Sequence, residues 1–402
     1  MNEATAVEAR GRVSHGCPGI WNDAQVTGWK RVTDYIRREG SISAMQLAHA
    51  GRKASTHRAI DGTHPYSAAD ATRGLVPWDI IGPTGDPTGP GQNVPHQMTK
   101  ADIADVVRAF ADGAKRADAA GFDIVEIHGA HGYLIASFLS SVSNTRNDEY
   151  GGDRAGRMRF ALDITHAVRE AWPSHKPLFF RVSSLDGADG WSLDDTVAFA
   201  LELKARGVDV VDCSSGGLTG SAVTAPIKRY PGFQVPFAEA VHKAGVPSMA
   251  VGLILDGPQA EKILQEGKAD LIAIGRQALY DPFWPVHAAE QLGCDPDFAL
   301  WPEEYGCGWK NAATAWSAPD GPAPPDRPGN GITHEPARNR GVAGQLPAAG
   351  TAGCAGYEFA GDAFDARLSG RHPPRRASLH RLAFGGWTRE YPVNSEECST
   401  CP

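Results

Sequence analysis

No stretch of the sequence approaches the ~18 uninterrupted apolar residues that a membrane-spanning helix requires. The amino-terminal residues MNEATAVEARGR also lack the basic and apolar regions of a secretory signal. Basic residues are not gathered in a patch, and the formal net charge is −8. These absences argue against a membrane span and against nucleic acid or an anionic membrane as a partner, although they are compatible with a local phosphate site.

Cysteine is scarce, with 7 residues scattered through a chain of 402. An odd, scattered set without a signal sequence is typical of reduced thiols and not of a disulfide framework. We therefore expect a cytoplasmic protein. Cys398 and Cys401 form half of a metal site at most, and a chance pair is the simpler interpretation.

The chain also lacks a G-x-G-x-x-G sequence after an early strand, which argues against a Rossmann dinucleotide-binding sheet. Short apolar runs instead alternate with amphipathic segments. The expected strands are Ser43–Ala48, Phe122–Ile127, Leu178–Val182, Val208–Asp212, Ser248–Val251 and Asp270–Ile274. The expected helices are Asp23–Arg38, Ala101–Ala119, Arg157–Ala171, Leu193–Ala205, Phe237–Ala244 and Pro258–Gln265. Repeated alternation of this kind predicts an α/β fold built on a parallel sheet.

Small residues follow the last two expected strands. Gly252 comes after one strand, and Gly275 with Arg276 comes after the other. Each glycine alone could be an ordinary turn residue. Together with the Arg276 cation and the order of the strands, they indicate the phosphate site of a (β/α)8 TIM barrel.

Two regions interrupt the alternation. Residues 56–98, called here the long loop, are rich in Pro, Gly, Thr and Trp and favour a lid or wall over the catalytic face of a barrel. From about Gly308 the periodicity ends in a stretch rich in Pro, Gly and Arg. We therefore expect a barrel domain over residues 1–307 and an irregular tail of low order over residues 308–402.

Two histidines and a tyrosine follow the apolar run that ends at Ile127. A purely structural strand end does not need titratable side chains, so His128, His131 and Tyr133 are candidate catalytic residues. A zinc site would need a third ligand, and none is obvious. One histidine could belong to the core, but two beside a tyrosine favour neutral N–H donors to an oxygen that becomes negative, with the tyrosine as a proton donor. The segment that follows, residues 144–150, is too polar for a core and too varied for a flexible linker.

Two further polar residues lie in or at the end of expected strands. Gln46 could pair with the amide-like edge of a cofactor, although a solvated loop glutamine fits the sequence equally well. Arg181 interrupts the apolar run Leu178–Val182, and a buried cation is costly unless it is paired. A role beside an anionic ring is therefore the better interpretation of Arg181.

The motifs that contain these residues resemble those of the Old Yellow Enzyme family, in the branch of the thermophilic-like ene-reductases and xenobiotic reductases. The resemblance extends over about residues 3–306. The matching segments are QLAHAGRKA from Gln46, HGAHGYL from His128, SNTRNDEYGGD from Ser143, FRVS from Phe180 and IGRQALYDPFW from Ile274.

The resemblance implies a TIM barrel that binds FMN non-covalently and oxidises NADPH or NADH. The hydride then passes to the β-carbon of an activated alkene. The resemblance implies that Gln46 contacts the pyrimidine edge of the flavin and that Arg181 lies at its N1/O2 side, where it favours the anionic reduced flavin. It assigns the FMN phosphate to Gly252, Gly275 and Arg276.

The same resemblance implies that His128 and His131 hold the carbonyl oxygen of a small electrophilic alkene. It implies that Tyr133 lies near the position of proton delivery. We expect no metal, and a homo-oligomer is compatible with the family.

The two ends of the chain differ from the family pattern. Residues Glu3–Val7 resemble the end of the family's second strand, so we expect the first barrel strand to be missing, together with the flavin-facing thiol that it carries in this branch. Cys17 follows the second strand and does not replace that thiol. The segment Glu304–Trp309 lacks the arginine that reaches a neighbouring subunit's site. Two functions therefore stay open: an FMN-dependent NAD(P)H oxidoreductase that reduces activated C=C bonds, or a non-catalytic remnant that binds FMN weakly or not at all.

Overall fold

The computed structural model describes residues 1–187, 190–218, 227–302, 305–306 and 308. Its main sheet has seven parallel strands in the order β1-β2-β5-β6-β7-β8-β9. The strands are β1 (Thr5–Ala6), β2 (Ala44–Ala48), β5 (Ile124–Gly129), β6 (Leu178–Ser183), β7 (Val210–Ser214), β8 (Ser248–Ala250) and β9 (Leu271–Ile272). Within the long loop, β3 (Ile81–Gly82) pairs with β4 (His96–Gln97).

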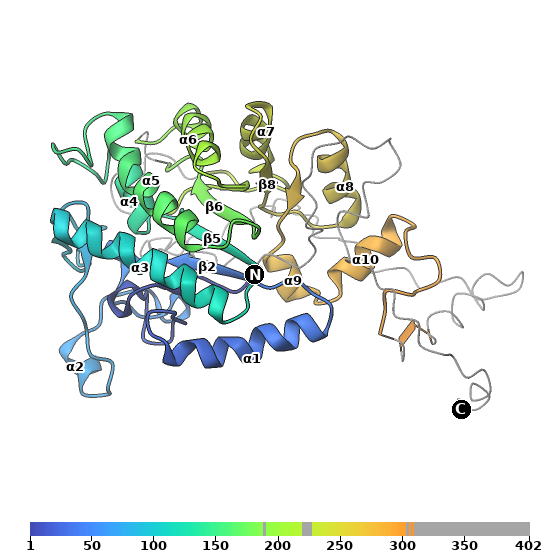
Figure 1. The fold of residues 1–402 in the computed structure, drawn as a ribbon, viewed down its shortest axis with the longest axis horizontal. Coiled ribbons are helices and arrows are strands. Elements are labelled where there is room, and N and C mark those ends of the chain that lie inside the picture. The colour runs from blue at the N-terminus through green and yellow to red at the C-terminus, as the bar shows by residue number, and fades with distance from the viewer. Residues whose placement is uncertain (188–189, 219–226, 303–304, 307, 309–402) are drawn as a thin grey trace, which may run out of the picture.

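Helices alternate with the strands and follow one another around the outside of the sheet (Figure 1). The longer ones are α1 (Ala24–Arg38), α3 (Lys100–Ala119), α5 (Arg154–Ala171), α6 (Leu193–Ala205), α7 (Val235–Lys243), α8 (Gly257–Gln265) and α10 (Trp284–Gln291). The shorter ones are α2 (Ala68–Ala71), α4 (Leu134–Leu139), α9 (Arg276–Tyr280) and the 3-10 helices η1 (Ala9–Gly11), η2 (Gly51–Lys53) and η3 (Ala59–Asp61). Every strand and helix predicted from the sequence is present, with small shifts at the ends. Among the described helices, none is long and apolar enough to cross a bilayer.

The strands of the main sheet pair in chain order, without the reversal of a doubly wound sheet, as the strands of a (β/α)8 barrel do. A (β/α)8 barrel has eight parallel strands, and the described residues supply seven of that kind, with β1 and β9 at the edges. The first strand, β1, lies in the segment that resembles a second barrel strand. The predicted TIM-barrel class is therefore confirmed. Nearly all of the expected tail, including Cys398 and Cys401, lies outside the described residues, and the expected boundary near Gly308 stays a prediction.

The connection between α3 and β5 shows how local sequence sets the bounds of an element. Thr99 and Asp102 form a capping box at the start of α3, and the Thr99 hydroxyl accepts from the Asp102 N–H at 3.1 Å. Gly121 ends the helix with a φ of 88°, and the N–H of Phe122 donates back to the carbonyl of Ala117 at 3.0 Å. Phe122 therefore belongs to the helix end, and β5 begins after it, later than the sequence predicted.

Two apolar clusters lie on opposite faces of the sheet. The larger one packs between the sheet and the helices and includes Met45, Val125 and Phe180. The smaller one lies on the inner face, away from the helices. Its members on adjacent strands are Ala44, Ile124, Phe179, Val210 and Met249. Burial of both faces accounts for the near-continuous apolar runs that identified the strands.

Candidate active site

The inner face of the sheet is arranged in three layers, because alternate residues of a strand point to the same side. The apolar layer nearest the amino ends contains Ala44, Ile124, Phe179 and Val210. Two residues further along β2, β5, β6 and β7 lies a polar middle layer of Gln46, Glu126, Arg181 and Asp212. Two residues further again, at the carboxyl ends, lie His128, Ser183 and Ser214. Candidate residues from distant parts of the sequence therefore meet at one end of the sheet.

His128 lies within β5, one residue before the strand ends. The N–H of Ala130 donates to its Nδ1 at 3.4 Å, which places the proton of a neutral ring on Nε2. Burial and the nearby Arg181 cation lower the pKa of His128 to about 3, so the ring is neutral at neutral pH. Within the described part of the chain, Nε2 makes no hydrogen bond, and its N–H is available as a donor.

His131 follows β5 with a left-handed backbone φ of 61°. The main-chain N–H of His131 donates to Ser183 Oγ at 2.8 Å, and the ring Nε2 lies 2.8 Å from Ser214 Oγ. Burial, and after it the Arg181 cation, lowers the pKa of His131, so this ring is neutral as well. The centroids of the His128 and His131 rings are 5.1 Å apart. The structure thus brings the two predicted imidazoles together, and their role as donors to a substrate oxygen stays a prediction.

Tyr133 completes this group, and Lys53 adds a residue that the sequence analysis missed. The centroid of the Tyr133 ring lies 5.2 Å from that of His128. Lys53 Nζ lies 5.4 Å from the centroid of the same tyrosine ring. It donates to the carbonyl of His131 at 2.7 Å and to the carbonyl of Gly217, so it holds the turn that carries His131. The sequence could have indicated Lys53 as a site residue, because it is one of two adjacent cations just after a buried strand.

Lys53 makes the stability of the fold depend on pH. Burial, and after it the neighbouring Arg52 cation, lowers the pKa of Lys53 from 10.5 to about 7. Between these values Lys53 is protonated in the unfolded chain and neutral in the folded chain, so the contribution of Lys53 to stability should rise with pH across this window. We expect Lys53→Met to flatten that rise, measured by denaturant unfolding at several pH values in the window.

The matched control for this prediction is Lys30→Met on α1. Lys30 is exposed, and its Nζ lies 2.8 Å from Asp34 Oδ1. The control should keep the rise of stability with pH. A rise that persists unchanged in Lys53→Met would contradict the prediction.

Gln46 and Arg181 lie in the middle layer, each beside a carboxyl residue that the sequence analysis missed. Gln46 Nε2 donates to Glu126 Oε1 at 2.6 Å. Arg181 Nε lies 3.3 Å from Asp212 Oδ2, and both side chains are buried. Glu126 and Asp212 interrupt apolar strands just as Arg181 does, so the same sequence argument could have found them.

The three predicted phosphate residues line one hollow at the ends of β8 and β9. Gly252 has a φ of 110°, and a Cβ there would come within 2.7 Å of Gln234 Nε2. Gly275 precedes α9, and Arg276 is the exposed first residue of that helix. The structure therefore brings Gly252, Gly275 and Arg276 together, and the binding of a phosphate there stays a prediction.

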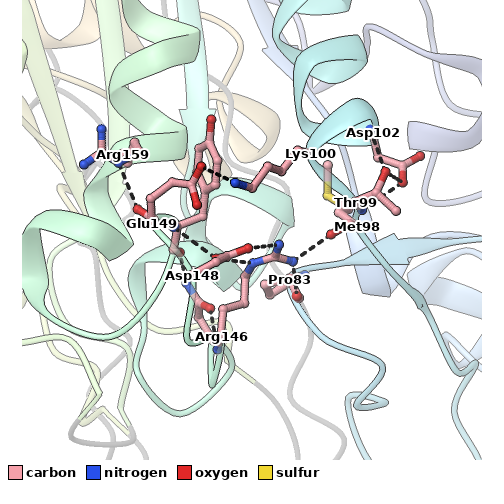
Figure 2. Close-up of polar contacts among 11 residues, drawn as sticks. Pro83, Met98, Thr99, Lys100, Asp102, Arg146, Asp148, Glu149 and Arg159 are labelled. Carbon is pink, nitrogen blue, oxygen red and sulfur yellow. Dashed lines mark hydrogen bonds and ion pairs between the residues drawn. The ribbon is translucent and has the colours of Figure 1, made fainter.

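The polar segment that follows α4 joins the long loop to the barrel (Figure 2). The Arg146 guanidinium donates to the carbonyls of Pro83 at 2.8 Å and Met98 at 2.7 Å, and its Nε lies 3.0 Å from Asp148 Oδ1. The expectation that this segment is too polar for a core is wrong for Asn144 and Arg146, which are 3% and 8% exposed. Carbonyl and carboxylate oxygens accept from their donors, which makes the burial tolerable. These residues support the fold around the site.

Comparison with known proteins identifies the family. A model of the NADH:flavin oxidoreductase / NADH oxidase family matches residues 1–295. The chain belongs to this family. An NADPH dehydrogenase from Geobacillus sp. (strain WCH70) is 44% identical to it over 310 residues, which are 77% of this chain and 83% of the relative. An NADPH dehydrogenase from Bacillus licheniformis is 47% identical over 294 residues, which are 73% of this chain and 79% of the relative. This flavin oxidoreductase is thus a member of the Old Yellow Enzyme family, as its motifs indicated.

Solved structures agree with the barrel architecture of this flavin oxidoreductase. Morphinone reductase superposes with a TM-score of 0.58 and 25% identity, over 72% of this chain and 76% of that chain. A 2-naphthoyl-CoA reductase in complex with 2-naphthoyl-CoA superposes with a TM-score of 0.61 and 26% identity, over 73% of this chain. The aligned part spans 44% of the 2-naphthoyl-CoA reductase chain.

Proposed function

We propose that this flavin oxidoreductase binds FMN non-covalently and reduces the C=C bond of enones and related electrophilic alkenes, with NADPH or NADH as the reductant. The observation that carries the proposal is the group of neutral His128 and His131 with Tyr133, at the carboxyl end of β5 and next to the layer that contains Gln46 and Arg181. The names of the relatives, NADPH dehydrogenase and morphinone reductase, support the reductant and the class of reaction.

The residues of the inner face fit FMN. Arg181 supplies a buried cation that would stabilise a negatively charged ring. The hollow at Gly252, Gly275 and Arg276 is lined by two glycines, which have no side chains, and by an exposed guanidinium, and both features suit a phosphate. Bound FMN would supply the two-electron chemistry, by accepting a hydride from NAD(P)H and delivering it to the alkene.

The side chains of His128, His131 and Tyr133 would activate the alkene. His128 and His131 are neutral at neutral pH, and they would donate hydrogen bonds to the carbonyl oxygen of an enone as it gains negative charge. Donors in a site from which water is excluded stabilise such an oxygen far more than water does. The Tyr133 hydroxyl would deliver the proton to the α-carbon.

The test is a flavin assay on the purified chain. We expect a yellow protein with stoichiometric FMN, bleached by NADPH and reoxidised by 2-cyclohexenone, with the saturated ketone as the product. Free FMN with the same reagents is the control. A colourless chain that does not take up added FMN would support the alternative of a non-catalytic remnant. Light scattering of the FMN-loaded chain would test whether it is a homo-oligomer.

A further inference from the structure

The proposed chemistry does not use Glu126, although this residue is wholly buried in the middle layer, with 0% of its surface exposed. Its Oε1 accepts from Gln46 Nε2 at 2.6 Å. Its Oε2 is buried and makes no hydrogen bond within the described part of the chain. A buried carboxyl oxygen without a partner lowers stability. A contribution to stability therefore does not explain why a glutamate lies at this position.

We infer that Glu126 is a positioning residue that fixes the orientation of the Gln46 side-chain amide, and thereby the hydrogen-bonding group that Gln46 presents to the flavin. This inference rests on the proposed binding of FMN. It concerns the step before chemistry, in which the protein recognises the ring.

The two ends of a glutamine amide have nearly the same shape but opposite hydrogen-bonding character. Gln46 alone could present either its NH2 group or its Oε1 atom to a ligand. The Glu126 carboxyl oxygen accepts from the NH2 end and therefore holds it. Oε1 makes no hydrogen bond within the described residues, and it is left as the acceptor. The pair thus fixes Oε1 as the acceptor that Gln46 presents, which suits a ligand edge that offers an N–H, such as the imide of the flavin pyrimidine ring.

Glu126 also faces the Arg181 cation. A role as counter-charge for Arg181 must therefore be distinguished from the positioning of Gln46. Arg181, on the adjacent strand, opposes the effect of burial on the pKa of Glu126, and burial dominates, so that the pKa is raised. Arg181 is paired on its other side with Asp212, at 3.3 Å. If Glu126 acted as a counter-charge for Arg181, its effect on FMN binding would not depend on Gln46. The two roles therefore predict different results in a double-mutant cycle.

The test is the affinity for FMN of four proteins: the wild type, Glu126→Gln, Gln46→Ala and the double variant. Glu126→Gln keeps the volume of the side chain but can donate as well as accept, so the Gln46 amide is free to turn. Loss of one oriented hydrogen bond should weaken FMN binding by about tenfold, as measured by quenching of FMN fluorescence. In the Gln46→Ala background, Glu126→Gln should cause no further loss.

Asp212→Asn is the matched control, because it alters an equally buried carboxyl that contacts Arg181 and not Gln46. Its effect on FMN affinity should be the same factor with and without Gln46→Ala. The inference is overturned if Glu126→Gln binds FMN as the wild type does, or if it weakens binding by the same factor in both backgrounds. The second result is the one expected of a merely structural role.

Thermal unfolding shows whether each variant folds. If Glu126→Gln does not fold, Glu126→Asp takes its place in the cycle, because it withdraws the carboxyl group by one methylene, and the same outcomes apply. A wild-type chain that does not bind FMN would contradict the proposed function and this inference together. A wild-type chain that binds FMN, with Glu126→Gln unchanged, would contradict this inference alone.

Discussion

Arg146→Ala should lower the free energy of unfolding by about 2–5 kcal/mol, because the change removes a buried guanidinium that donates to two main-chain carbonyls, and each buried acceptor left without its donor costs about 1–3 kcal/mol. The substitution leaves the carbonyls of Pro83 and Met98 without their donor and Asp148 without its cation. These carbonyls lie in the long loop, so the loop also loses its attachment to the segment after α4 (Figure 2). Denaturant unfolding measures the loss, and limited proteolysis should show earlier cleavage within the long loop.

Two further variants make this prediction specific to the buried guanidinium. Arg146→Lys keeps the charge but not the planar fork of donors, so it should recover only part of the lost stability. Lys100→Ala removes a cation that pairs with Glu149 on the surface nearby, and it should leave stability nearly unchanged. The prediction fails if Arg146→Ala is as mild as Lys100→Ala.

The second large effect is expected in ligand binding. The phenolate form of an acidic para-substituted phenol presents a negatively charged oxygen, as the enone would while it is being reduced. Replacing both His128 and His131 by alanine should weaken the binding of such a phenol by at least about 100-fold, because each hydrogen bond to a charged oxygen contributes about 1.5–3 kcal/mol. FMN should stay bound, because Gln46, Arg181 and the glycine hollow are unchanged. Calorimetric titration of the FMN-loaded protein gives both results.

His166→Ala is the control for the histidine pair, because His166 lies exposed on α5. It should bind the phenol and FMN as the wild type does. Release of FMN from the His128→Ala/His131→Ala variant would mean that these histidines hold the cofactor and not the substrate. That outcome would overturn the roles assigned to them.

The sequence predicted the main elements of this fold because the relevant interactions are local. Apolar runs marked the strands, and the Thr99–Asp102 box is a contact between residues three apart along the chain. The candidate residues also lie where expected, since parallel strands bring their carboxyl ends to one edge. The bounds were less certain: the turn at Gly121 draws Phe122 into the end of α3, and the apolar pattern alone could not show this.

The sequence by itself therefore determined the α/β class, the family motifs and the identity of His128, His131 and Tyr133 as a group. Only the tertiary structure decided which polar side chains pair, because pairing depends on register between strands far apart in the chain. Register sets Gln46 opposite Glu126 and Arg181 opposite Asp212. The role of Arg146 was also decided by the tertiary structure. Its partners Pro83 and Met98 lie in the long loop, far from Arg146 in the sequence, so the motif around Arg146 could not predict these contacts.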